Sequence, residues 1–496
     1  MKQKTTFTLR NHFIAFATFL SLVSYAQENQ KPAIESFENK AVLKEYKTSK
    51  ECKISLSDAH HKYGQKSLEW SWKSPSSFTT QHFRVLTQEE SPLKYGDHFP
   101  ASPTLSLSIY NEVAQNEKIK FASSTNGENE IFFEIDLTFT GWRTIWVPYY
   151  EMLGTAPKKT AAIDINTFTV STAAKKGKLF FDDIVFSQYQ DDRHSYPDMI
   201  VPFIKSDKKS GADHWMPLIQ NIEYINNVTK ISISEAKKKD LLKIEARLDK
   251  SMTLDKKYKV YMESMKKRFD KLGLSYNGKT VVGPPMDYKT KQVFFDIAQQ
   301  GKDNHNKIDA LGKTLKKLAN FHDRATPADQ KEIERMFVLG TRYYLDQGWQ
   351  SGSSGGTRHH IGYSVRELAE GFFIMRNTLK KEGLLDEVGA SLHWLFNLGM
   401  VLGDENKFHV NIDYLNTQAY YHLMLLFLVE SPEKQAILLN NYSNYIGIVL
   451  SQQDQEWGFK VDGTSWHHNG HYPAYGMGAL EMFQRLFKRF QVLVFA

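Results

Sequence analysis

Cysteine is almost absent from this chain of 496 residues, in which Cys52 is the one thiol. A single cysteine excludes an intramolecular disulfide and any metal site that needs several thiolates. Stability must therefore come from packing, which a chain of this length can supply in two or three domains. No apolar run is long enough to span a bilayer. The composition, 41% hydrophobic and 24% charged, is that of an ordinary globular protein.

Residues 1–26 form a separate segment whose composition predicts export. Lys2, Lys4 and Arg10 precede the short apolar run 13–23, and the segment ends in Ser-Tyr-Ala. These three features are typical of a cleaved signal peptide, so we expect a secreted or periplasmic protein. A membrane anchor is disfavoured because no stop-transfer flank follows.

The charge balance is weakly basic. Loss of the three positive charges of residues 1–26 lowers the formal net charge from +7 to about +4, which permits a polyanionic ligand but does not require one. We expect no nucleic-acid partner, no membrane span and a monomeric protein.

Residues 27–195 have the alternating pattern of short β-strands. Runs such as 67–72, 105–110 and 131–137 alternate apolar and polar residues, with Gly and Asn-Gly turns between them. This pattern predicts a β-sandwich of the jelly-roll kind. The segment Thr-Gly-Trp-Arg-Thr at 140–144 is similar to carbohydrate-binding jelly rolls of exported enzymes. The domain therefore binds glycan or Ca²⁺, or only buttresses its neighbour, and we favour the second interpretation.

A charged, proline-containing segment at 196–215 predicts a linker, and the helical period then dominates from 216 to 496. The helices are expected at 234–248, 256–272, 307–321, 327–347, 365–381, 387–402, 418–428, 433–451 and 479–490. Consecutive helices of this length, with polar aromatic loops between them, favour an α/α toroid. Because the last residues have no polar cap and the helical hairpins are few, we expect a truncated product with an incomplete toroid.

One group of chemically useful residues follows a Gly/Ser-rich loop. His359 and His360 end this loop, and Tyr363 and Arg366 stand at the start of the next helix. Metal binding by the two histidines is disfavoured, because adjacent side chains point apart and further zinc ligands at suitable spacing are missing. The remaining alternatives are a substrate-binding loop and a pair of exposed loop histidines.

A second group lies in residues 457–476, where three histidines, two tyrosines and Trp466 occur close together. Pro473 and the glycines exclude a continuous helix, which predicts an ordered loop. Histidine titrates near neutrality, and tyrosine can act as acid or base, so His468 and Tyr475 are candidates for acid–base chemistry. The alternative is a structural aromatic turn.

A third segment, 411–417, opens a helix with residues that suit an N-cap. Asn416 or Asp413 could contribute to the wall of a substrate site. Capping alone explains the pattern nearly as well.

Four segments resemble, in order, those of the chondroitin sulfate ABC lyase family, a group of glycosaminoglycan polysaccharide lyases. They are Phe-Thr-Gly-Trp-Arg-Thr (139–144), His-His-x-Gly-Tyr-Ser-x-Arg (359–366), Asp-Tyr-x-Asn-Thr (413–417) and Asp-Gly-Thr-x-Trp-x-His-x-Gly-x-Tyr-Pro-x-Tyr (462–475). Four motifs in the family's order are far more specific than one alone. The resemblance covers the chain from the sandwich to its last residues.

This resemblance implies β-elimination on a uronate-containing glycosaminoglycan, with a 4,5-unsaturated uronate as product. It makes His468 the base at C5 of the uronic acid. It makes Tyr475 the group that protonates the leaving oxygen and serves as base for the other epimer. It places His359 near the substrate carboxylate, whose charge must be neutralised to stabilise the intermediate.

The substrate-binding residues that we expect around this centre are His360, Tyr363, Arg366, Asn416 and Trp466. The expected substrates are chondroitin and dermatan sulfate, with hyaluronan as a further candidate. No cofactor is expected with certainty, and a divalent cation such as Ca²⁺ stays open, because related lyases sometimes need one.

The family also uses an arginine and a glutamate that would lie beyond Ala496, so only its N-terminal part is matched. The alternative function is therefore a non-catalytic exported glycan-binding fragment. A hydrolase on the same scaffold is disfavoured, because it needs two carboxylates flanking the bond, and no obvious pair stands near the motifs.

Overall fold

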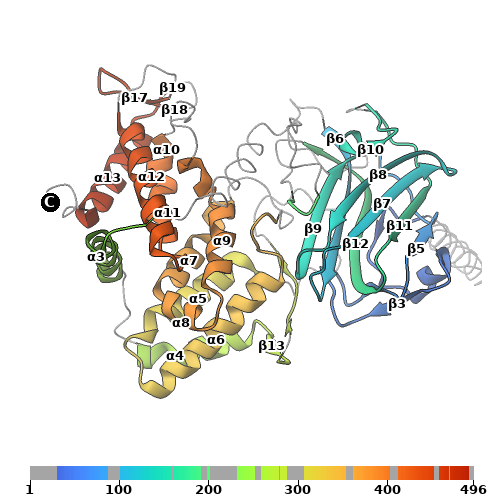
Figure 1. Cartoon of the computed structure of the whole chain (residues 1–496), viewed down its shortest axis with the longest axis horizontal. Coiled ribbons are helices and arrows are strands. Elements are labelled where there is room, and N and C mark those ends of the chain that lie inside the picture. Colours follow the sequence, from blue (N-terminus) through green and yellow to red (C-terminus); the bar gives the residue numbers. More distant parts are fainter. Residues whose placement is uncertain are drawn as a thin grey trace, which may run out of the picture.

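The computed structural model describes residues 31–87, 101–158, 161–191, 198–201, 232–251, 258–278, 280–287, 306–353, 361–402, 412–451, 457–467 and 470–490. Its N-terminal part consists of antiparallel sheets and its C-terminal part of helices, placed side by side (Figure 1). The predicted signal segment and most of the predicted linker lie outside the described residues.

Two antiparallel sheets form the N-terminal part. The first has the order β3-β4-β12-β6-β9, with β1 also paired to β12, and the second has the order β10-β8-β7-β11-β5-β2. Their strands are β1 (Ile34–Glu35), β2 (Tyr46–Thr48), β3 (Cys52–Ser57), β4 (Ser67–Trp72), β5 (Ser76–Thr80), β6 (Ala101–Asn111), β7 (Lys118–Thr125), β8 (Glu128–Asp136), β9 (Gly141–Pro148), β10 (Leu153–Gly154), β11 (Thr167–Thr172) and β12 (Gly177–Asp191), with short 3-10 helices at Lys40–Glu45 and Tyr149–Glu151. The predicted sandwich-like N-terminal part is confirmed.

Aromatic side chains fill the space between the two sheets. Trp70 and Phe78 are fully buried, with their rings edge to face at 5.2 Å, and Phe181 lies 5.7 Å from Phe78. Alternation along β4 turns Trp70 and Trp72 toward this core and leaves Ser71 on the outer face. Large buried aromatic rings supply much of the packing energy that a chain without disulfides needs.

The C-terminal part is built of helices with short strands between them. The helices are α3 (Glu235–Ser251), α4 (Tyr258–Asp270), α5 (Ile308–His322), α6 (Pro327–Asp346), α7 (Ile361–Ile374), α8 (Arg376–Lys381), α9 (Leu385–Leu395), η6 (Leu398–Val401), α10 (Ile412–Thr417), α11 (Ala419–Leu425), α12 (Pro432–Leu450) and α13 (Pro473–Phe490). The strands are β13 (Ser275–Tyr276), β14 (Val281–Val282), β15 (Met286–Asp287), β16 (Asn306–Lys307), β17 (Gly458–Phe459), β18 (Ser465–His467) and β19 (Gly470–His471). None of the described helices combines the length and apolarity that a membrane crossing requires. The helical character is as predicted, whereas the toroid stays a prediction.

Local chemistry explains where several helices begin and end. Thr326 caps α6 by accepting a hydrogen bond from the Asp329 N–H at 3.3 Å, and Pro327 occupies the first helical position. The helix predicted at 387–402 is instead broken after α9, because Asn397 adopts a left-handed conformation with φ of 52°. The helix predicted at 365–381 is likewise divided into α7 and α8 at Met375.

The two parts meet where β9 contacts the C-terminal end of α6. The backbone approach is so close that a Cβ atom on Gly141 would lie 2.6 Å from the carbonyl oxygen of Asp346, and Gly141 has a φ of +80°. The Tyr110 hydroxyl donates to Asp346 Oδ1 at 2.7 Å, and Gln350 Nε2 donates to the Thr140 carbonyl at 2.7 Å. The segment 139–144 therefore takes part in the contact between the sheets and the helices.

Candidate active site

The segment rich in histidine and tyrosine forms a small antiparallel sheet followed by a helix. Strand β17 pairs with β18 through Gly458 and Trp466, and β18 pairs with β19 through His467 and Gly470. Helix α13 then starts at Pro473, which places Tyr475 in its first turn. The prediction of a loop through residue 476 is therefore wrong for its last residues, because proline is well suited to the first position of a helix.

His467 and Tyr475 lie next to each other in this structure. Their ring centroids are 4.9 Å apart with the planes tilted by 34°, and the His467 side chain is only 4% exposed. Trp457 and Tyr472 contact His467 edge to face, with centroids at 5.4 and 6.2 Å. Tyr475 is half-buried and Tyr472 is 39% exposed, so this aromatic cluster reaches the protein surface.

His467 is a residue that the sequence reasoning did not assign to the site. In a strand, alternate residues point to the same face, so His467 and Ser465, both buried, share one face of β18. Trp466 lies on the opposite face, half-buried, and its Nε1 donates to Thr464 Oγ1 at 3.0 Å. The structure thus brings Tyr475 to His467 and turns Trp466 away from both.

Two glycines of α13 allow α10 and β18 to approach it closely. A Cβ atom on Gly478 would lie 3.1 Å from Asn416 Oδ1, and a Cβ atom on Gly476 would overlap Ser465 Oγ. The exposed Asn416 side chain therefore lies against α13, about one helical turn beyond Tyr475. This places a predicted binding residue and a predicted catalytic residue on adjoining helices.

Arg366 joins the same region from α7. Its guanidinium donates to the Thr417 carbonyl at 2.8 Å and lies 5.3 Å from the centroid of the Tyr421 ring. Thr417 directly follows Asn416 at the end of α10. The motifs at 359–366, 413–417 and 462–475 therefore each place a described residue on this helix or beside it. A cation held in this position attracts anionic groups of a ligand.

Three predicted site residues, His359, His360 and His468, lie outside the described residues. Tyr363 belongs to α7, but its side chain is not described either. The convergence of His359, His468 and Tyr475 therefore stays a prediction. Within the described part of the chain, no group of three or more His, Cys, Asp or Glu side chains is arranged to hold a metal ion.

Two other histidines, His393 and His422, are buried and structural. Burial lowers the pKa of each imidazole to about 4, so both are neutral near neutral pH. His393 Nε2 pairs with the Leu425 carbonyl and His422 Nε2 with the Phe396 carbonyl, both at 2.8 Å. As neutral rings they donate these hydrogen bonds, which connect the end of α9 to α11.

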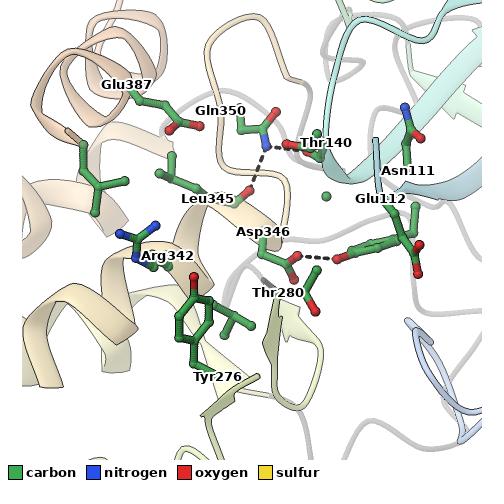
Figure 2. A pocket seen from close by; sticks show the side chains of 14 residues that line it. Asn111, Glu112, Thr140, Tyr276, Thr280, Arg342, Leu345, Asp346, Gln350 and Glu387 are labelled. Carbon is green, nitrogen blue, oxygen red and sulfur yellow. Dashed lines mark hydrogen bonds between the residues drawn. The ribbon is translucent and has the colours of Figure 1, made fainter. Parts of the chain in front are cut away.

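A separate polar pocket of about 230 Å³ lies between the sheets and the helices, with Arg342, Asp346, Tyr276 and Thr140 among its lining residues (Figure 2). Burial raises the pKa of the Asp346 carboxyl to about 6, against the opposing effect of the Tyr110 hydrogen bond. No pattern in the sequence predicts this pocket, because its residues come from strands and helices far apart in the chain. In Figure 1, the nearby strand β13 and the sheet β17-β18-β19 lie at opposite ends of the helical part.

Comparisons with known proteins agree with the two-part architecture. A family model described as "Lyase, catalytic" matches residues 228–492, which is more than half of the chain, and a model described as "Lyase, N terminal" matches residues 31–203.

Curated relatives match across both parts. The chain is 29% identical over 456 residues to a chondroitin sulfate ABC exolyase of Proteus vulgaris, covering 87% of this chain and 44% of the relative. It is 27% identical to a chondroitin sulfate ABC exolyase of Bacteroides thetaiotaomicron (88% and 43% covered) and 26% identical to a chondroitin sulfate ABC endolyase of Proteus vulgaris (88% and 46% covered). The chain thus spans less than half the length of these relatives. With both models matched in order, the chain belongs to the lyase family that includes the chondroitin sulfate ABC lyases.

Proposed function

We propose that this chain acts in the cleavage of chondroitin and dermatan sulfate-type glycosaminoglycans by β-elimination at the uronic acid. The observation that carries the proposal is the position of Tyr475. It lies in the first turn of α13, reaches the surface, and is bordered by His467 and by the helix that carries Asn416. A phenol that can transfer a proton, beside residues of the motifs at 413–417 and 462–475, is the arrangement that this chemistry needs.

The proposed reaction removes one proton and breaks one bond. His468 takes the proton from C5 of the uronic acid, and the electron pair forms the C4–C5 double bond. The bond from C4 to the glycosidic oxygen breaks, and Tyr475 gives this leaving oxygen a proton. For the other epimer, Tyr475 acts as the base.

The acidity of C5 depends on the carboxylate of the same sugar. Deprotonation places negative charge on this group, so a positive or hydrogen-bonding partner there stabilises the transition state. We assign His359 to this role, with His360, Tyr363, Arg366, Asn416 and Trp466 as binding residues. Trp466 is the least favoured of these, because it faces away from Tyr475 on β18.

The wider architecture belongs to the same proposal. We infer a signal peptide over 1–26, a jelly-roll domain over 27–195, a linker over 196–215 and an α/α toroid over 216–496. Export to the periplasm or beyond the cell would place the protein where polymeric substrates are found.

The test is to incubate the purified chain with chondroitin sulfate and to follow the ultraviolet absorbance of the unsaturated product. Tyr475→Phe should lower the rate by roughly 100- to 10,000-fold, which is the usual contribution of a positioned acid or base. His471→Ala is the matched control, because His471 is an exposed imidazole of the same small sheet.

The outcomes separate the candidate functions. A flat absorbance trace with retained glycan binding would favour the non-catalytic glycan-binding alternative. Cleavage of galacturonan or alginate without cleavage of chondroitin sulfate would keep the lyase chemistry and refute the substrate. Equal losses in Tyr475→Phe and His471→Ala would refute the role of Tyr475.

A further inference from the structure

A groove of about 840 Å³ opens at one end of the first sheet, far along the chain from the helices of the candidate active site. Five lysines line it, against one acidic residue, Glu51. They are Lys50, Lys53, Lys73, Lys176 and Lys178, and we call the hollow that they line the lysine groove. The polar pocket between the sheets and the helices, in contrast, is lined by charges of both signs, Arg342 with Glu112, Asp346 and Glu387.

The register of the first sheet explains why these lysines gather. Ser71 on β4 pairs with Lys53 on β3 at one side and with Lys178 on β12 at the other. Paired residues of antiparallel strands share a face, so both lysines stand on the outer face, roughly 10 Å apart across two strand spacings.

The other three lysines lie in the connections at the same end of the sheet. Lys50 lies two residues before β3, Lys73 directly follows β4, and Lys176 directly precedes β12. All three are exposed. The positive charges therefore surround the open end of three neighbouring strands.

Most of this charge is not compensated by carboxylates of the described residues. Lys178 donates to Glu112 Oε1 at 2.9 Å. Within the described ranges, no carboxylate lies within salt-bridge distance of Lys50, Lys53, Lys73 or Lys176. Like charges held close together repel one another, and a bound polyanion removes this repulsion.

The floor of the groove favours a sugar chain over a nucleic acid. Ser71 and Gln115 offer neutral hydrogen-bonding groups beside the lysines, as hydroxyl-rich ligands require. Trp72 is the only aromatic residue in the lining, and it is 3% exposed with its ring against Gly177. A nucleobase would find no exposed ring on which to stack.

We propose that the lysine groove binds the sulfate and carboxylate groups of a glycosaminoglycan segment that is not being cleaved. The choice of this polyanion rests on the function proposed above. Such a second site raises the effective concentration of a long chain at the active site, while a short fragment cannot use it.

The binding test uses the whole chain carrying Tyr475→Phe and a fluorescently labelled chondroitin sulfate polymer. In this background, Lys50→Gln, Lys53→Gln and Lys73→Gln together should weaken binding roughly tenfold or more, since each exposed ion pair contributes roughly two- to fivefold. Lys259→Gln, Lys267→Gln and Lys271→Gln remove the same charge from the exposed face of α4 and just beyond it and should change binding by less than roughly twofold.

A gain of binding provides a test that a folding defect cannot imitate. Glu51→Gln removes the acidic residue of the groove and should strengthen binding by roughly two- to fivefold. Equal losses in the two lysine triples, or no loss in the groove triple, would overturn the proposal. Tighter binding of duplex DNA than of chondroitin sulfate through the same lysines would also overturn it, in favour of a polynucleotide ligand.

A turnover assay separates this proposal from the proposed function. With Tyr475 intact, the groove triple should raise KM for the long polymer and leave kcat for a tetrasaccharide unchanged. Binding through the groove without any unsaturated product would support the groove and refute the lyase function. Product formation with a KM for the polymer that the triple does not change would refute the groove and support the lyase.

Discussion

Replacement of Gly141 by alanine is the sharpest test of how the sheets and the helices are joined. Gly141 opens β9 with a φ of +80°, and a Cβ atom there would lie 2.6 Å from the Asp346 carbonyl oxygen. The Gly141→Ala variant must therefore adopt a left-handed backbone and also move the end of α6.

These two effects can be estimated separately. A left-handed conformation costs an alanine about 1–2 kcal/mol. Overlap with a neighbour that has little room to shift adds about 1–3 kcal/mol. The free energy of unfolding should therefore fall by about 2–5 kcal/mol in total.

Gly127→Ala is the matched control, because it has the backbone cost without the overlap. Gly127 has a φ of +85° in the β7–β8 turn, and a Cβ atom there would meet nothing within 4 Å. Its unfolding free energy should fall by only about 1–2 kcal/mol.

Calorimetric melting of both variants provides the measurement, with about 2–4 °C expected per kcal/mol in units of this size. Limited proteolysis reports separately on whether the two parts have come apart. Equal melting temperatures for the two variants would show that the contact between Gly141 and Asp346 is not tight, and would refute the reasoning.

Three further changes test other contacts. Asp346→Asn should remove part of the pH dependence of the free energy of unfolding. The Asp346 pKa is raised from 3.8 to about 6. The stability that the protonated carboxyl contributes is therefore present below about pH 4 and is lost as the pH rises through about 6. Wild type should lose about 1–3 kcal/mol relative to this variant across that range, measured by urea unfolding at several pH values. Arg376→Met removes the hydrogen bonds of a buried guanidinium to Asp249, at 2.6 and 2.8 Å, and to Glu245, at 2.5 Å. The free energy of unfolding should fall by about 2–4 kcal/mol. Hydrogen exchange should show that α3, which carries both carboxylates, loses protection first. Gly476→Ala should lower the free energy of unfolding, measured in urea, by about 1–3 kcal/mol, because its Cβ overlaps Ser465 Oγ. A second change, Ser465→Gly, should recover part of this loss.

Each of these changes has an outcome that contradicts it. An unchanged pH profile in Asp346→Asn would mean that folding does not raise the pKa of this carboxyl. Normal exchange protection of α3 in Arg376→Met would show that apolar packing alone holds this helix. Additive effects in the Gly476 and Ser465 double variant would show that their side chains do not share a contact.

Patterns of short range predicted most of the local structure. The alternation along β4 and the helical period of α5 and α6 were sufficient to predict these elements. Each has one buried face, and that face dictates the spacing of its apolar residues. The break at Asn397 was within reach, since asparagine tolerates the left-handed conformation better than most residues. Pro473 was misinterpreted as a loop residue, although proline often begins a helix.

Contacts between distant residues were beyond such patterns. The bond from Tyr110 to Asp346 joins positions 236 residues apart. The lysine groove exists only because β12 lies beside β4 in the sheet, an order that the sequence does not display. For the candidate active site, the motifs predicted Tyr475, and this assignment stays a prediction. Its neighbour His467 became apparent only when the strand faces were known.

The backbone contact between β9 and α6 also limits how this protein can be rebuilt. Gly141 faces the Asp346 carbonyl, and Gly348 faces the Trp142 carbonyl in return, so neither surface has room for one additional carbon. Consider a chimaera in which a foreign sugar-binding module replaces the sheet domain. Residues other than glycine at this contact would carry Cβ atoms that collide with the backbone of the other part, so the module could not pack against the helices. Any such design has to keep residues 141–143 and 346–348 together, because each segment is shaped to fit the other.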